Sequence, residues 1–285
     1  MNTTALKFRY LHMLNVIKIA LDFYIKSSIH VALSVLALAQ ISMEVAEIEN
    51  NLPLLIFIFS SAFSAYNFIK FSPSFTTLNF SKLNTLFIVL TIGSLVLSMI
   101  VIFLLPRLVL VFALLGSFLV MGYSTPLSYN TSNWRNKKGW KLYLVVFSWV
   151  CLTVGVPLAS VSVLDLLLFF KLSVLQGIYI YVAILPFEIG DMNFDEPSLQ
   201  TLPQQFGVLR VKKIGLILLG FGSLLSVFIF EVLSSFALGT LVAFLILAVL
   251  LWRSDENQSP YYARFWVEGI PIVWLGCIYF FDFML

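Results

Sequence analysis

The chain has 285 residues, of which 60% are hydrophobic and 11% are charged, and its mean hydropathy is +1.00. Soluble domains average about 45–50% apolar and about 25% charged residues, so this composition excludes an ordinary soluble domain and predicts a polytopic membrane protein. The net charge of +3 gives no indication of a nucleic-acid partner.

Apolar segments recur along the whole chain at a length that suits membrane helices, which need about 20 residues each. We predict nine spans, at about Ser28–Met43, Leu52–Ile69, Asn84–Leu105, Leu108–Tyr123, Leu142–Val161, Leu164–Leu185, Ile214–Phe230, Ser234–Trp252 and Phe265–Met284. Their Phe and Leu content lacks the alternation of a membrane barrel, and no soluble insert separates them. The sequence therefore predicts an all-α protein with one domain, residues 1–285.

The basic residues are distributed unevenly about these spans. When sides are counted alternately, fifteen of the seventeen Lys and Arg residues share the side of the N-terminus, and only Arg107 and Lys171 fall on the other. The positive-inside rule places that side in the cytoplasm. We therefore expect an integral protein of the bacterial cytoplasmic membrane, in contact with its lipids, with a cytoplasmic N-terminus.

One polar segment, 187–207, interrupts this pattern after the sixth span. Within a continuing helix, Glu188, Asp191 and Asp195 would fall at i, i+3 and i+7 on one face, where like charges repel. A bound cation reverses that repulsion, and carboxylate oxygens suit Mg²⁺. The alternative is a solvated interfacial loop, which needs no metal.

Basic residues surround this segment on the same side of the membrane. A metal held by carboxylates, together with Lys and Arg side chains, can bind a polyanion such as a diphosphate. The alternative is that these residues attract anionic lipid head groups, as basic loops of membrane proteins do.

Four stretches resemble one family, the UbiA-type intramembrane prenyltransferases. Asp191-x-x-x-Asp195 with Thr201-Leu202-Pro203 and Gly207 is similar to the family's second aspartate-rich motif. The other three are the Tyr123-Ser124-Thr125-Pro126 segment, the run from Arg135 through Lys138-Gly139-Trp140-Lys141 to Pro157, and Asn67 at the end of the second span.

This resemblance implies nine helices around a central cavity beneath a cytoplasmic cap. It further implies that Mg²⁺ binds the diphosphate of an isoprenoid donor, and that a lipophilic or aromatic acceptor captures the isoprenyl group. The implied catalytic residues are Asp191 and Asp195, with Glu188 as a further metal ligand. The implied donor-binding residues are Asn67, Lys70, Tyr123, Arg135, Lys138 and Lys141.

The first aspartate-rich motif of the family is absent. Phe68, Phe71 and Phe75 stand at its three aspartate positions, and a phenyl ring offers no oxygen to a metal. Three explanations stay open: a one-metal enzyme in which Lys70 replaces the second cation, a family member with a changed reaction, or a non-catalytic lipid-binding protein. For Lys70, a snorkelling side chain is the simpler alternative.

Two further features bear on function. Glu268, near the cytoplasmic end of the last span, is expected to face the cavity or to pair with Arg264, because an unpaired charge is costly there. A transporter is a rival class, but the outer half of the spans carries few charges and no inverted repeat is visible.

Overall fold

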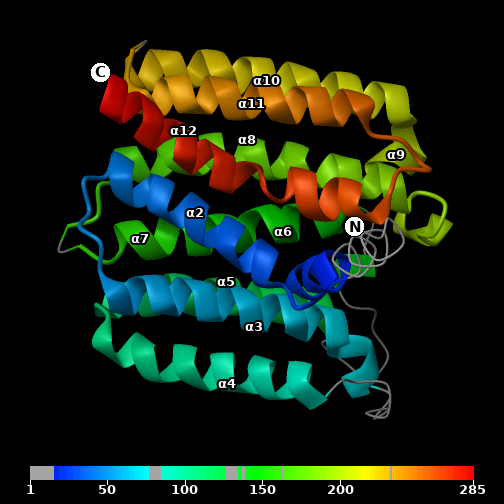
Figure 1. Cartoon of the computed structure of the whole chain (residues 1–285), viewed down its shortest axis with the longest axis horizontal. Helices are drawn as coiled ribbons and strands as arrows, with labels where there is room; N and C mark the ends of the chain where they lie inside the picture. The colour runs from blue at the N-terminus through cyan, green and yellow to red at the C-terminus, as the bar shows by residue number, and fades with distance from the viewer. Residues whose placement is uncertain (1–15, 77–84, 126–133, 137–138, 162, 232) are drawn as a thin grey trace, which may run out of the picture.

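The computed structural model describes residues 16–76, 85–125, 134–136, 139–161, 163–231 and 233–285 (Figure 1). The α-helices are α2 (Ile29–Val45), α3 (Leu52–Thr76), α4 (Thr85–Val101), α5 (Arg107–Ser124), α6 (Trp140–Val150), α7 (Val156–Leu158), α8 (Leu166–Asp191), α9 (Leu202–Phe206), α10 (Val208–Phe230), α11 (Ser235–Arg253) and α12 (Ile270–Met284). Shorter 3-10 and π segments are η2 (Ile102–Leu104), η3 (Trp134–Asn136), η4 (Cys151–Gly155), η5 (Pro197–Leu199) and η6 (Tyr262–Val267).

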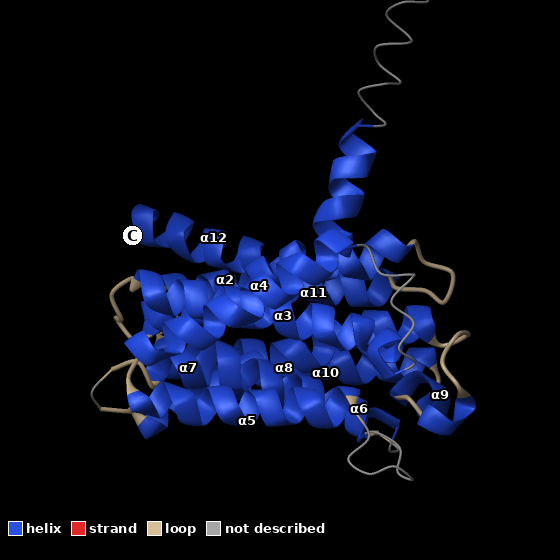
Figure 2. Ribbon diagram, turned by 90° about the horizontal axis from the view of Figure 1, so that it is seen from below, coloured by secondary structure: helices blue, strands red, loops and turns tan. Residues whose placement is uncertain are grey.

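Every regular element in these ranges is helical (Figure 2), which confirms the all-α prediction. Among the described residues, eight helical segments are long and apolar enough to cross a membrane, and a ninth is obtained if the helix Val16–Lys26 and α2 count as one bent span. The core of a bilayer offers no water to backbone N–H and C=O groups, and a helix pairs these groups within its own segment. Apolar segments of this length therefore form helices.

The long helices form a closed ring. Each helix packs against the next in the order α2, α3, α5, α6, α8, α10, α11, α12, and α12 packs against α2 to close the ring. Helix α4 lies outside the ring, against α3. Figure 1 shows α3 with α4 at one edge of the ring and α10 with α11 at the opposite edge. Apolar side chains fill two clusters, one around Tyr179 and Trp274 and the other around Leu54 and Ile58.

A buried amide ties three members of the ring together. Gln176 on α8 is fully buried; it accepts a hydrogen bond from Thr153 Oγ1 of η4 at 2.7 Å and donates to the Leu38 carbonyl of α2 at 2.9 Å. Because polar groups in an apolar interior must be paired, these bonds fix how the helices sit against each other.

The first span bends by 58° between Val16–Lys26 and α2, so that the N-terminal helix leaves the bundle in Figure 2. The bend occurs at Ser28, whose φ of 68° is the left-handed conformation that ends a helix. The helix Val16–Lys26 and α9 lie at the same end of the bundle, called the capped end below.

Candidate functional site

A cavity of about 270 Å³ lies inside the ring. Its walls come from α3, α5, η3, α6, α8 and the η6–α12 segment, so the cavity depends on helices from all parts of the chain. Five of the predicted site residues line it, namely Tyr123, Arg135, Lys141, Glu188 and Asp191. These five residues, which were predicted from the sequence, therefore lie around one cavity.

One face of α8 forms the cavity wall from the interior to the capped end. Its lining residues run from Tyr179 and Ile180 through Ala183 to Glu188 and Asp191, with the three- and four-residue spacing of a helix face. Glu188 is 2% exposed and accepts a hydrogen bond from the Leu202 amide at 3.4 Å. Its carboxylate therefore connects the cavity wall to the first residue of α9 at the capped end.

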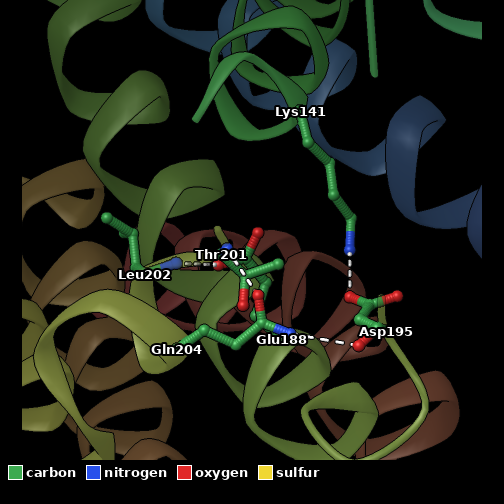
Figure 3. A network of polar contacts seen from close by, with 6 residues as sticks. All are labelled: Lys141, Glu188, Asp195, Thr201, Leu202 and Gln204. Atoms are coloured by element: carbon green, nitrogen blue, oxygen red, sulfur yellow. Dashed lines mark hydrogen bonds and ion pairs between the residues drawn. The ribbon is translucent and has the colours of Figure 1, made fainter. Parts of the chain in front are cut away.

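Asp195 differs from the other two carboxylates because α8 ends at Asp191. It does not line the cavity, and it accepts a hydrogen bond from Lys141 Nζ at 3.1 Å (Figure 3). Both side chains of this ion pair are largely buried, at 16% and 12% exposure. Asp195 thus positions Lys141, and its direct binding of Mg²⁺ stays a prediction.

The α9 segment is attached to the main chain at Asp195. The Gln204 side chain donates to the Asp195 carbonyl at 3.1 Å and accepts from the Thr201 amide at 3.0 Å (Figure 3). This capping arrangement starts α9 and satisfies amides that the first helical turn would leave unpaired. The Thr-Leu-Pro segment therefore closes the capped end over the acidic end of α8.

Two cationic side chains reach the cavity from this end. The Arg135 guanidinium lies 5.6 Å from the ring centroid of Tyr123, a cation–π distance that holds both side chains on the wall. Lys141 opens α6 and points toward the end of α8 (Figure 3). Lys138 lies outside the described residues.

The end of α3 is organised differently. Asn67 is fully buried, accepts a hydrogen bond from Ser28 Oγ at 2.8 Å and donates to the Ser27 carbonyl at 3.1 Å. It therefore holds the bend before α2 and does not line the cavity. Lys70 is exposed and donates to the Lys26 carbonyl, also outside the cavity. Donor binding by either residue stays a prediction.

Of the phenylalanines that replace the missing motif, Phe71 packs against another helix. Phe71 contacts Phe87 of α4, with ring centroids 6.3 Å apart. The side chain of Phe75 lies outside the described part. Among the described residues, no three carboxylate, His or Cys groups are close enough to hold a metal ion. Glu188 and Asp191 are the described acidic residues that line this end of the cavity, and their binding of Mg²⁺ stays a prediction.

The interior of the cavity is aromatic. Tyr66, Trp149, Tyr179 and Phe187 contribute to its walls, and the Trp149 indole donates to the Tyr66 hydroxyl at 2.9 Å. Trp149 belongs to the stretch from Arg135 to Pro157 that resembles the family, whereas no sequence pattern selects the other three among so many aromatic residues. Glu268 also lines the cavity, which confirms the first of its two expected placements, and no ion pair with Arg264 is found.

The architecture is similar to that of several solved structures. No family model and no curated protein matches the chain. Solved structures do: the apo structure of a UbiA homologue from Aeropyrum pernix K1 has 14% identity and a TM-score of 0.65, over 90% of this chain and 99% of that one.

Two further structures show the same similarity. A digeranylgeranylglyceryl phosphate synthase has 11% identity and a TM-score of 0.59, over 92% of this chain and 96% of that one. A UbiA homologue from Archaeoglobus fulgidus bound to GPP and Mg²⁺ has 14% identity and a TM-score of 0.55, over 90% and 95%. The chain therefore has the UbiA-type fold, as its motifs predicted.

Proposed function

We propose that the protein binds an isoprenyl diphosphate at the capped end of its cavity and transfers the isoprenyl group to a lipophilic or aromatic acceptor. The observation that carries this proposal is the convergence of Lys141, Arg135 and Asp191 on the mouth of an aromatic-walled cavity. A polyphosphate head and a hydrocarbon tail require these two environments side by side. The GPP-bound relative with the same fold supports the choice of ligand.

The roles of the side chains follow from their chemistry. Lys141 and Arg135 would bind diphosphate oxygens and stabilise the negative charge that grows on the leaving group. Asp195 would keep Lys141 in place through the ion pair. The aromatic walls would exclude water and stabilise an allylic cation through their π faces.

A single Mg²⁺ is the metal content that these residues suit. Glu188 and Asp191 would hold it, and the ion when bound would add positive charge at the diphosphate. The positions that would hold a second ion in the family are phenylalanines, two of which are Phe68 and Phe71. Lys141 and Arg135 would supply charge in its absence.

A second candidate function is lipid binding without transfer. The observation in its favour is that Phe71, at an aspartate position of the family's first motif, packs against Phe87. This position therefore makes a hydrophobic contact and offers no metal ligand. A protein of this kind would keep the cavity and its cationic mouth and would release no diphosphate.

The test is to reconstitute the full chain in nanodiscs with Mg²⁺, geranyl, farnesyl or geranylgeranyl diphosphate, and lipophilic alcohols or phenols. Diphosphate release that depends on both substrates is expected. Binding of the diphosphates without release under any pairing would select the lipid-binding candidate. Absence of binding, with a monodisperse folded protein, would reject both.

A further inference from the structure

Glu268 is, with Asp191, one of two cavity carboxylates that have no hydrogen-bond or ion-pair partner among the described residues. It lines the cavity at membrane depth. Lys70 and Arg264 act on it electrostatically but lie beyond ion-pair distance. Burying a carboxylate without a partner in an apolar region costs free energy, and a ligand that forms a hydrogen bond with it would offset that cost.

The chain at Glu268 is joined to the middle of α8. The Tyr179 hydroxyl donates to the carbonyl of Val267, the residue before Glu268, at 3.5 Å. Tyr179 precedes Glu188 by nine positions on α8, which corresponds to about 14 Å along a helix. Glu268 therefore follows a residue that contacts α8 more than two turns before its acidic end.

A tyrosine hydroxyl belongs to the same cavity. Tyr66 of α3 and Glu268 both line its wall. The Tyr66 oxygen already accepts the Trp149 indole N–H at 2.9 Å, so its own proton is available for donation. His30 on α2 does not compete, because its ring nitrogens face Tyr24 and the Phe265 carbonyl.

We infer that Glu268 and Tyr66 form an acceptor site that binds the hydroxyl group of a lipophilic alcohol or phenol. The ligand hydroxyl donates to the Glu268 carboxylate and accepts from the Tyr66 hydroxyl, so that both groups gain a partner. An amine would leave Tyr66 without an acceptor, and a hydrocarbon would leave both groups unpaired. The assignment of the hydroxyl as acceptor substrate rests on the proposed function; the binding site does not.

The experiment uses the full chain in nanodiscs and three probes of equal chain length: a bromoalkyl alcohol, the matching bromoalkane and the matching bromoalkylamine. Bromine quenches the fluorescence of nearby indoles. Trp149 lines the cavity, so the part of the quenching that is lost in Trp149→Phe reports binding inside it. We expect saturable quenching by the alcohol, weakened at least tenfold in Glu268→Ala and at most threefold in Glu268→Gln, whose carbonyl oxygen still accepts. The bromoalkane should not distinguish the variants.

The matched control is Glu44→Ala. Glu44 lies outside the cavity and accepts a hydrogen bond from Tyr279 at 2.6 Å, so its loss should leave alcohol binding unchanged. Equal alcohol binding by wild type and Glu268→Ala would overturn the inference, as would tighter binding of the amine that Glu268→Gln abolishes. Geranyl diphosphate binding is measured in parallel on the wild-type protein. If the wild type binds the alcohol in this Glu268-dependent way but binds no geranyl diphosphate, the proposed function is rejected and the inference stands.

Discussion

The ends of α3 and α8 carry corresponding motifs in the resemblance, and the structure uses them in opposite ways. At the end of α8, Glu188 and Asp191 line the cavity and Asp195 positions a lysine. At the end of α3, Asn67 secures a bend and Phe71 packs on a neighbouring helix. A polar residue near a cavity can therefore serve ligand or scaffold, and its hydrogen-bond partners decide which.

The largest effect on stability is expected from Asn67→Ala. This change removes two buried hydrogen bonds and leaves the Ser27 carbonyl unpaired, which should lower the free energy of unfolding by about 2–3 kcal/mol. Unfolding in a denaturing detergent measures it. Ser64→Ala, on the same helix, removes one local bond and should cost less than half as much. Weakened geranyl diphosphate binding at unchanged stability would instead place Asn67 in the ligand site.

Lys141→Ala tests the cationic mouth. Loss of a charge-assisted contact to diphosphate should weaken geranyl diphosphate binding by about 2 kcal/mol, or about thirtyfold. Lys212→Ala removes an exposed lysine that bonds the Trp252 carbonyl and should change affinity little. If Asp195 acts only through Lys141, Asp195→Ala should add nothing in the Lys141→Ala background. A further loss in the double variant would indicate a separate role for Asp195.

Asp191→Asn addresses the metal. With Mg²⁺ present, we expect about tenfold weaker geranyl diphosphate binding, or ~1.4 kcal/mol, and no change when a chelator has removed the metal. Isothermal titration in both conditions measures the difference. Asp282→Asn, an exposed carboxylate at the end of α12, is the control. Equal losses with and without Mg²⁺ would show that Asp191 contacts the ligand without a metal.

Gln204→Ala should have the smallest effect, because it removes two hydrogen bonds of the partly exposed cap. Opening of α9 should become easier by about 1 kcal/mol, seen as faster amide hydrogen exchange over Leu202–Phe206. Gln205→Ala removes an exposed hydrogen bond to the Gln200 carbonyl and leaves the Asp195 network intact, so it should change exchange less than Gln204→Ala. If neither variant alters exchange, the cap does not depend on the Asp195 network.

Local patterns along the chain were enough to predict the membrane class, the spans and the acidic end of α8. Apolar length predicts a span because backbone groups must pair internally, and the acids at 188 and 191 share a helix face by spacing alone. The packing of the helices was needed to learn that Asn67 points to Ser28, that Asp195 meets Lys141, and that Glu268 shares a cavity with Tyr66. Each of these depends on helices far apart in the chain, whose packing no local pattern encodes.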